Sequence, residues 1–319
     1  MMEQNTDHTD IFKFKNNSEI FNLHSGKVPY LSFKCLDEKG VINAFSTRKG
    51  GVSEGFFAEM NLSLTGGDDR EKVMENYRRL SSAVGVDINR MVSSKQTHST
   101  NVRRVTEEDF GKGIIRDRDY DCVDGLITDV KGLTLVTFYA DCIPLYFYSE
   151  RRSCIGLSHS GWRGTVERMG EVTVKRLFEE FGAEPEELIC CIGPGICGDC
   201  FETDAETAQI FCKAFPEASL SELISFISKE NSESDIREKD ISELKKQGIV
   251  SASDITDGRK YYIDLWYANR LVLLSAGVRP ENIYVTNLCT RCNNKLLFSH
   301  RICGNRRGNM AAMLCMKEE

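Results

Sequence analysis

The feature that most constrains the fold is a succession of three short apolar segments between Gly132 and Ser160. They read GLTLVTFYA, IPLYFYS and CIGLSHS, and each predicts a buried β-strand because it is short, apolar and bounded by polar residues. Helical patterns at 68–85 and 165–182 flank them. Because strands and helices interleave and hairpins also occur, we expect a mixed α/β (α+β) fold. Its form would be a layered sandwich of mixed β-sheets with flanking helices.

The two helical patterns have recognisable ends. In DDREKVMENYRRLSSAVG, Asp68 or Asp69 can cap the first turn and Gly85 can end the helix. Its apolar residues share one face, namely Val73, Tyr77, Leu80 and Val84. Gly182 closes the second helix. Further helices are expected in DAETAQIFCKAF and DLWYANRLVLLSAG, and further strands in ELICCIGPGI, NIYVTNLCT and LLFSHR.

The chain of 319 residues is long enough for one large domain. We expect a loosely ordered tail over 1–25 and a single catalytic domain over 26–319, with a charged insertion at about 225–258. The centre of the insertion, 229–247, has eleven charged residues among nineteen, so we interpret it as a solvated helix or loop. A plain surface insertion and a lid both fit this composition.

Composition and charge exclude several classes of partner. The net charge is −7 and no basic stripe stands out, so nucleic acid is not an expected partner. The longest apolar runs fall short of a membrane span, so no membrane is expected either. The polar N-terminus does not resemble an export signal, which favours a cytoplasmic location. In that location we expect the 13 cysteines to be reduced thiols, some of which are metal ligands. We expect the protein to be a monomer or a homodimer.

Cys142 and His159 lie on either side of an expected hairpin. If Glu150 and Arg151 form a two-residue turn, Cys142 stands directly opposite His159. Cross-strand partners have Cβ atoms about 4.5–5.5 Å apart, which suits two ligands that each lie about 2.0–2.3 Å from one ion. The same arrangement suits a thiolate–imidazolium pair or two ordinary core residues.

His98, in the polar segment KQTHSTNV, is the natural third ligand among only five histidines. With Cys142 and His159 it completes a His-Cys-His set. Three protein ligands with an open fourth position are typical of a catalytic zinc site. Copper is the alternative ion, because imidazole and thiolate bind it as well.

The segment SGWRGTVERMG after His159 runs into the second helix. Exposed N–H groups and the helix dipole at such a start favour an anion, and Arg163 can add a charged fork, so we expect a phosphate site there. Packing of Arg163 on Trp162 is the alternative. Asp141 is a candidate general acid only because it precedes Cys142.

Two Cys-x-x-Cys pairs, CGDC at 197–200 and CTRC at 289–292, have several interpretations. A structural zinc site, a redox disulfide and ordinary burial all fit, although the gap between the pairs is far longer than in zinc ribbons. The segment SHRICGNRRGNM contributes Arg306 and Arg307, which either face a ligand or belong to the surface.

Several motifs together resemble one family. They are FSTRKGGVSEG, MNLS, KQTHSTNV, DGLITD, ADCIPL, LSHSGWRGT, IGPGICGDCFE, CTRC and LLFSHR, in that order over about residues 41–313. They resemble the YfiH-like laccase-domain family, which is described as purine nucleoside phosphorylases, polyphenol oxidoreductases and peptidoglycan-editing factors. The resemblance implies a single mixed α/β domain with zinc held by His98, Cys142 and His159.

The same resemblance implies phosphorolysis of adenosine, inosine and methylthioadenosine to the free base and ribose 1-phosphate, with adenosine deamination as a second activity. Its partners are then purine nucleosides and phosphate. Arg48 in STRKGG and Asn61 in MNLS match family positions expected to line the site, and Arg48, with Arg163, would bind the phosphate that attacks C1′ of the ribose. The segment FSHRICGNRRGNMAA departs from the family pattern by placing His300 where a tyrosine is usual, which affects substrate preference.

Three other functions compete with this one. Copper-dependent polyphenol oxidation is the first, although five histidines are too few for a multicopper cluster in one chain. The second is a hydrolase that edits peptidoglycan precursors, with Cys142 as nucleophile and His159 as base. The third is a binding scaffold that is stabilised by a metal and has no catalytic activity.

Overall fold

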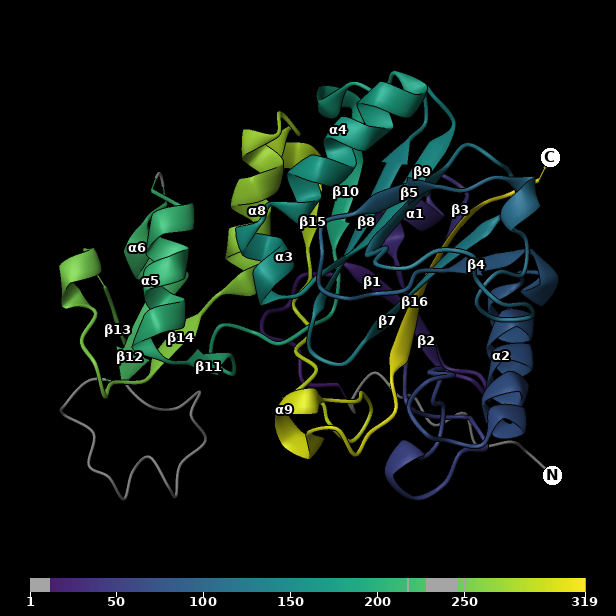
Figure 1. Cartoon of the computed structure of the whole chain (residues 1–319), viewed down its shortest axis with the longest axis horizontal. Coiled ribbons are helices and arrows are strands. Elements are labelled where there is room, and N and C mark those ends of the chain that lie inside the picture. The colour runs from purple at the N-terminus through teal and green to yellow at the C-terminus, as the bar shows by residue number, and fades with distance from the viewer. Residues whose placement is uncertain (1–11, 217, 228–245, 250, 319) are drawn as a thin grey trace.

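The computed structural model describes residues 12–216, 218–227, 246–249 and 251–318 (Figure 1). The first of its three sheets has the strand order β1-β2-β3-β16-β7-β4. Its strands are β1 Phe21–His24, β2 Tyr30–Phe33, β3 Val41–Ser46, β16 Met310–Met316, β7 Thr134–Tyr139 and β4 Met91–Ser93. The second sheet has the order β15-β10-β8-β9-β6-β5. Its strands are β15 Ile283–Val285, β10 Ile189–Ile192, β8 Ile143–Ser149, β9 Cys154–Ser160, β6 Gly125–Thr128 and β5 Val102–Arg104.

The third sheet is smaller and lies to one side of the other two, at the left of Figure 1. Its order is β11-β14-β12-β13, with β11 Glu202–Thr203, β14 Tyr261–Ile263, β12 Ile224–Ile227 and β13 Lys246–Gly248. The first two sheets each contain both parallel and antiparallel pairs, whereas all pairs of the third are antiparallel. The expectation of a mixed α/β sandwich is therefore confirmed.

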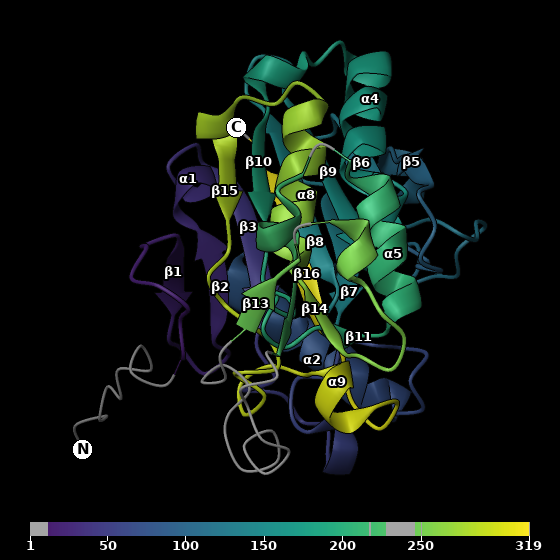
Figure 2. The same ribbon diagram turned by 90° about the vertical axis from the view of Figure 1, so that its left-hand side faces the viewer.

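Helices cover the outer faces of the two large sheets (Figures 1 and 2). The three long helices that do so are α2 Arg70–Val84 on the first sheet and α4 Met169–Phe181 and α8 Leu265–Ser275 on the second. The shorter helices are α1 Lys34–Asp37, α3 Trp162–Val166, α5 Ala205–Ala214, α6 Leu220–Leu223 and α9 His300–Cys303. Single 3-10 turns occur at Gly55–Phe57, Ile88–Arg90, Glu107–Asp109, Pro185–Glu187, Ala252–Asp254 and Pro280–Asn282.

Strand β8 shows why the sandwich has two apolar layers. All seven of its residues are buried, so the strand reads as a continuous apolar run. Tyr146 packs between the sheets, with its ring 5.3 Å from that of Phe33 in an edge-on arrangement. Leu145 and Phe147 point the other way, into the layer beneath α4 and α8. Each such buried side chain contributes about 1.5–3 kcal/mol to folding.

Helix α2 matches its sequence pattern closely. Asp69 caps it by accepting a hydrogen bond from the Glu71 N–H, and Gly85 ends it with a φ of 82°. Its predicted apolar face is buried against β3, β16 and β7, and consists of Val73, Tyr77, Leu80 and Val84. The periodicity of apolar residues was sufficient to predict this helix, because only one of its faces packs on a sheet.

Three local predictions were wrong. LLFSHR forms no strand: residues 296–299 are irregular and α9 begins at His300. The helix expected over 165–182 is split, because Arg168 adopts a left-handed φ of 61° between α3 and α4. The expected tail is too long, because Phe21–His24 form β1 and pair with β2. Residues 1–11 of that tail and residues 228–245 of the charged insertion lie outside the described residues.

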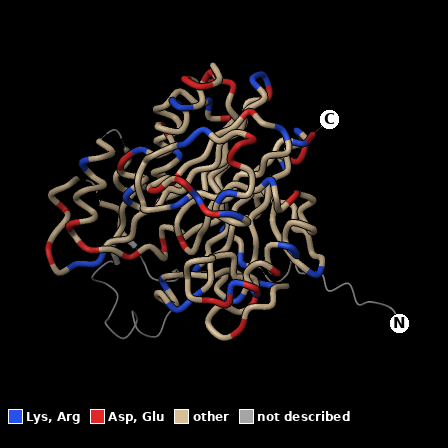
Figure 3. Tube along the Cα trace, turned by 45° about the vertical axis from the view of Figure 1, so that its right-hand side comes forward, with Lys and Arg blue, Asp and Glu red and all other residues tan. Residues whose placement is uncertain are grey.

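Basic and acidic positions are interspersed along the chain trace in Figure 3, and many form exposed ion pairs such as Arg104 with Asp129 and Lys34 with Glu19. Within the described parts of the chain, no helix is long and apolar enough to cross a lipid bilayer.

Candidate active site

Cys142 lies where the chain crosses from one sheet to the other. Strand β7 ends at Tyr139 in the first sheet, and β8 begins at Ile143 in the second. Between them, Asp141 adopts a φ of 90°, which non-glycine residues rarely do. The strained residue turns the chain just before Cys142, so this thiol projects from a crossover loop rather than from a strand.

The predicted pairing of Cys142 with His159 was wrong by two positions. The turn between β8 and β9 has four residues, 150–153, rather than two, so His159 pairs with Pro144. Continuing this register would put Cys142 opposite Gly161. The two side chains still meet, because a shift by two residues keeps them on the same side of the sheet.

Asp124 binds the side chain of His159 and the backbone of the loop that carries His98. Its Oδ1 accepts hydrogen bonds from His159 Nδ1 at 2.8 Å and from the His98 N–H at 3.0 Å. Its Oδ2 accepts from the N–H groups of Thr97 at 2.9 Å and Ser99 at 3.0 Å. Because Nδ1 of His159 is engaged by the carboxylate, Nε2 remains for a ligand, which is the usual arrangement around a metal-binding histidine.

The ligand atoms of His98, Cys142 and His159 lie within 4.8 Å of one another. Cys142 Sγ is 3.9 Å from His98 Nε2. Ligands of one tetrahedral zinc ion lie about 3.3–3.8 Å apart, so small adjustments of these side chains suffice. Gly161 keeps the centre open: a Cβ there would lie 3.0 Å from His98 Cδ2 and 3.1 Å from Cys142 Sγ. The donor set and the space around it therefore fit a bound transition metal.

The pKa values of Cys142, His159 and Asp124 depend on one another. Burial would raise the pKa of Cys142, but the two histidines lower it to about 6. Burial would lower the pKa of His159, but Cys142 and Asp124 raise it to about 9. Burial would likewise raise the pKa of Asp124, but hydrogen bonds from His159 and from backbone N–H groups lower it to about 2. Without metal, the centre is thus a thiolate–imidazolium pair held by a carboxylate.

A cavity of about 390 Å³ opens onto this centre, a size suited to a small ligand. Its lining combines the metal-ligand candidates with polar side chains and the ring of Phe138. It consists of Ser63, Leu64, Thr65, Ser94, Lys95, Gln96, His98, Gly113, Arg118, Phe138, Ala140, Cys142, His159, Arg307 and Asn309.

Two arginines bring positive charge into the cavity. Burial lowers the pKa of Arg307, whose Nη1 donates to the carbonyl of Gly308 and to Asn309 Oδ1. Arg118 is fixed by bonds from Nη1 to Ser93 Oγ at 3.2 Å and to the carbonyl of Ser94. Guanidinium groups held in this way suit an anion such as phosphate.

Arg48 lies outside the lining of the cavity. Its Nε and Nη2 donate to the carbonyl of Ala58 at 3.0 and 2.7 Å, and its Nη1 donates to the carbonyl of Asn294 at 2.9 Å. The guanidinium also stacks over Phe298, 4.6 Å from the ring centre. In this structure Arg48 fastens two loops to each other.

The other predicted residues take supporting positions. Arg163 is exposed and lies over the ring of Trp162, 4.4 Å from its centre, and it does not line the cavity. Asn61 is fully buried and positions the cavity wall, because its Oδ1 accepts from the N–H groups of Ser63 and Asn309, each at 3.0 Å. Helix α3, which follows Gly161, contributes nothing to the lining.

Asp141 does not face the metal-ligand candidates. Its Oδ1 accepts from Thr290 Oγ1 at 2.6 Å, and its Oδ2 accepts from Ser299 Oγ at 3.0 Å and from the Arg301 N–H at 2.7 Å. Through these three hydrogen bonds Asp141 fixes the crossover loop to the segments that carry Thr290 and Ser299.

Sequence reasoning missed Asp124, Arg118 and the role of Arg307. Asp124 begins the DGLITD motif, and its position just before a buried strand was the available signal. Arg118 lies in an irregular loop and Arg307 follows α9, so no periodicity marks either residue.

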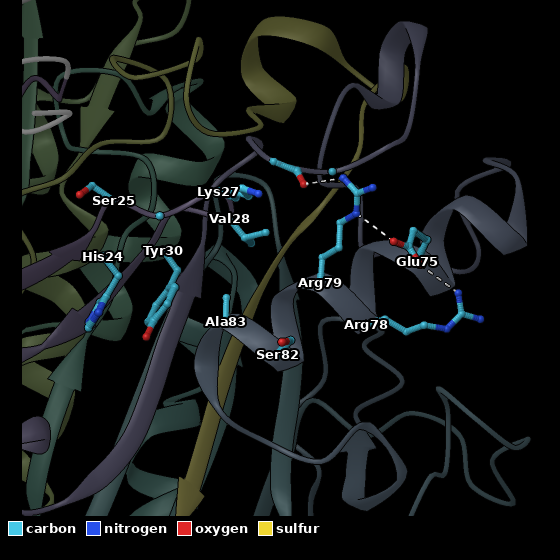
Figure 4. A pocket seen from close by; sticks show the side chains of 13 residues that line it. His24, Ser25, Lys27, Val28, Tyr30, Glu75, Arg78, Arg79, Ser82 and Ala83 are labelled. Atoms are coloured by element: carbon cyan, nitrogen blue, oxygen red, sulfur yellow. Dashed lines mark hydrogen bonds and ion pairs between the residues drawn. The ribbon is translucent and has the colours of Figure 1, made fainter. Parts of the chain in front are cut away.

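A larger cavity of about 940 Å³ lies between the β1–β2 hairpin and α2 (Figure 4). It shares no lining residue with the cavity at Cys142. Glu75 on α2 pairs with Arg79 at 2.9 Å and Arg78 at 3.2 Å, and Lys27 adds a further positive charge to the lining. Its lining includes no cysteine, and its one histidine, His24, is not part of the cluster of His98, Cys142 and His159.

Comparison with known sequences places the chain in a family. The profile of the family described as "Multi-copper polyphenol oxidoreductase laccase" matches residues 42–258 and 250–317. The chain belongs to this laccase family. Within the laccase family, the chain is 32% identical over 286 residues to the "Purine nucleoside phosphorylase YlmD" of Bacillus subtilis, covering 88% of this chain and 91% of that protein. It is 31% identical to "Adenosine deaminase RL5" from an unknown prokaryotic organism, covering 84% and 91%.

Solved structures confirm the fold. The crystal structure of YlmD from Geobacillus stearothermophilus superposes with a TM-score of 0.79 at 30% sequence identity, covering 94% of this chain and all of that one. Curated relatives in the laccase family are thus named as enzymes that act on purine nucleosides, whereas the family description refers to polyphenol oxidation.

Proposed function

We propose that this protein is a zinc-dependent purine nucleoside phosphorylase that converts adenosine, inosine and methylthioadenosine to the free base and ribose 1-phosphate, with adenosine deamination as a side activity. The observation that carries the proposal is the convergence of one metal-ligand set and two arginines on a single cavity. The names of relatives such as YlmD and RL5 support the substrate class.

His98, Cys142 and His159 would hold the zinc ion, which when bound supplies Lewis acidity at the open side of the cavity. Asp124 keeps the imidazole of His159 in one orientation by accepting its Nδ1 proton. The positive φ of 64° at His98 is stabilised by the N–H bonds of its loop to the same carboxylate. The chain therefore builds the centre before a substrate enters.

Arg307 and Arg118 take the role that the sequence suggested for Arg48 and Arg163. In the proposed reaction they hold phosphate near the ribose, so that a phosphate oxygen attacks C1′ while the bond to the base nitrogen breaks. Phe138 offers a partly exposed ring on which the purine can stack. The base leaves with the electron pair of that bond, and ribose 1-phosphate is the second product.

The deciding experiment is chromatography of adenosine, inosine and methylthioadenosine incubated with the protein, with and without phosphate. We expect free base and ribose 1-phosphate only when phosphate is present, and inosine from adenosine in either case. Release of base at equal rates without phosphate would show a hydrolase instead. Absence of free base under every condition contradicts the phosphorylase.

A second candidate follows from the thiolate–imidazolium pair. The arrangement matches that of a cysteine hydrolase: the pKa of Cys142 is lowered, His159 lies next to the thiol, and Asp124 binds His159. This candidate predicts that iodoacetamide abolishes turnover of an amide or peptidoglycan precursor while chelators have no effect.

Copper-dependent turnover of phenols, without need of phosphate, would favour the activity in the family description.

A further inference from the structure

Four cysteines outside the candidate active site converge on one point. Cys197 and Cys200 come from the loop between β10 and β11, and Cys289 and Cys292 come from the segment after β15. Their four Sγ atoms all lie within 4.8 Å of one another. All four are free thiols, and three of them are buried. Tertiary structure thus unites two pairs that are almost ninety residues apart in the sequence.

The spacing of the sulfurs fits one mononuclear ion. In a tetrahedral zinc site with Zn–S bonds of about 2.3 Å, neighbouring sulfurs lie about 3.8 Å apart. Cys200 Sγ is 3.6 Å from Cys292 Sγ, close to that separation and far beyond the length of a disulfide bond. An iron–sulfur cluster would have to place its inorganic core among the four sulfurs, which leaves the mononuclear ion as the better fit.

Backbone turns hold the two pairs in place. The N–H groups of Cys200 and Phe201 both donate to the carbonyl of Cys197, at 2.9 and 3.0 Å, which closes a tight turn over the first pair. The N–H of Cys197 donates to Cys289 Sγ at 3.3 Å, a bond that stabilises a thiolate. Gly195 pairs with Cys289 in a parallel bridge that joins the two segments.

Positive side chains stand next to the sulfurs. Arg291 donates from Nη1 to Cys200 Sγ at 3.4 Å. Lys15, which pairs with Asp199 at 2.9 Å, lies in the field of Cys197 and Cys292. A zinc ion with four thiolates has a net charge of −2, so nearby cations stabilise it.

We propose that Cys197, Cys200, Cys289 and Cys292 form a second metal centre, a closed structural zinc site. Zn²⁺ replaces the four thiol protons, which pass to the solvent as the thiolates bind the ion. With four protein ligands, no position is open to a substrate, which is the mark of a structural rather than a catalytic zinc site. The site is separate from the ligand set at His98.

The proposed zinc site is linked to the candidate active site through Asp141. Thr290, next to Cys289, donates from Oγ1 to Asp141 at 2.6 Å, and the N–H of Ile196 donates to the Asp141 carbonyl at 2.9 Å. Asp141 directly precedes Cys142. The zinc site therefore anchors the loop that presents the Cys142 thiol, so its loss should loosen the active site as well as the fold.

The test compares zinc content, by elemental analysis, of the full chain purified without added metal and of two variants. Cys200→Ala removes one ligand, and Cys212→Ala is the matched control because Cys212 is similarly buried but outside the cluster, at 8% exposed against 5% for Cys200. We expect Cys200→Ala to lose one zinc equivalent and to melt at a lower temperature, and Cys212→Ala to keep its zinc. Equal zinc content in all three proteins would overturn the proposal.

Measurements on the unmodified chain keep the proposal testable if Cys200→Ala does not fold. Reconstitution with Co²⁺ should give the intense charge-transfer and d–d absorption of a tetrahedral tetrathiolate, in addition to any signal from the site with two histidines. Native mass spectrometry should show a bound zinc ion that Cys212→Ala keeps. Two disulfides in place of the ion, or four thiols that react with a thiol reagent equally fast with and without a chelator, would refute it.

Discussion

Replacing Asp124 by asparagine tests whether one buried carboxylate orients the active site. Asp124 is fully buried, and its two oxygens accept hydrogen bonds from the N–H groups of Thr97, His98 and Ser99 and from His159 Nδ1. Asparagine has one oxygen and one NH₂ group. If the NH₂ group takes the place of Oδ1, the bonds from the backbone N–H of His98 and from His159 Nδ1 are lost together. If it takes the place of Oδ2, the bonds from the N–H groups of Thr97 and Ser99 are lost.

The size of the effect follows from the charge and from the geometry. The pKa of Asp124 is lowered to about 2 in the metal-free protein, so the carboxylate stabilises the fold at neutral pH by about 2 kcal/mol. This contribution is present above the ordinary pKa of aspartate and is lost as the pH falls through about 2. Loss of a bond that orients a metal ligand weakens metal affinity about 10–100-fold, or about 1.4–2.7 kcal/mol.

Zinc should therefore leave the active site of Asp124→Asn at a 10–100-fold lower concentration of a chromophoric chelator, while the four-cysteine site keeps its zinc. Asp129→Asn is the matched control, because Asp129 ends the same segment and pairs with the exposed Arg104. Unfolding by urea at pH 7 gives the stability change. If Asp124→Asn releases zinc within twofold of the control and retains its stability, the orienting role is refuted.

Three further predictions concern separate parts of the molecule. His98→Ala should abolish turnover without unfolding the protein, because this side chain is exposed; a collapse of the melting temperature would favour a scaffold instead. Arg307→Ala should raise the KM for phosphate at least about tenfold, as loss of a charge-assisted contact does, whereas Arg163→Ala should not change it. Burial would raise the pKa of Asp109, but hydrogen bonds from Lys112 and a backbone N–H lower it. Asp109→Asn should thus lower the free energy of unfolding at pH 7, as measured with urea. The difference from the unmodified chain should shrink as the pH falls below the ordinary aspartate pKa and through the lowered pKa of Asp109.

The two cysteine pairs show how distant contacts alter an interpretation. Each pair alone fits burial, redox chemistry or metal binding, and the sequence separation argued against a joint site. The parallel bridge between Gly195 and Cys289 removes that objection, because it brings the two segments together irrespective of their distance along the chain. Asp141 links the two groups of candidate ligands, because Thr290, next to Cys289, donates to its side chain and Cys142 follows it in the chain.

Arg48 and Arg307 show that a sequence motif does not determine which arginine lines a cavity. Both are arginines near glycines, and the motif around Arg48 suggested the phosphate role. In the structure the donors of Arg48 are taken by backbone carbonyls, whereas Arg307 lines the cavity. The direction of a long side chain depends on what surrounds it, which a linear motif does not contain.

The sequence by itself determined the elements whose signal is local. The strands β7, β8 and β9 and the capped helix α2 follow from periodicity and end residues, because each buries its own apolar side chains in a way that neighbouring residues specify. The choice of His98, Cys142 and His159 also came from the sequence. Only the tertiary structure decided the register of the hairpin, the crossover at Asp141 and the grouping of the ligands around Asp124. These features depend on turn length and on contacts between sheets. Such contacts join residues that are far apart in the sequence and that no local pattern relates to each other.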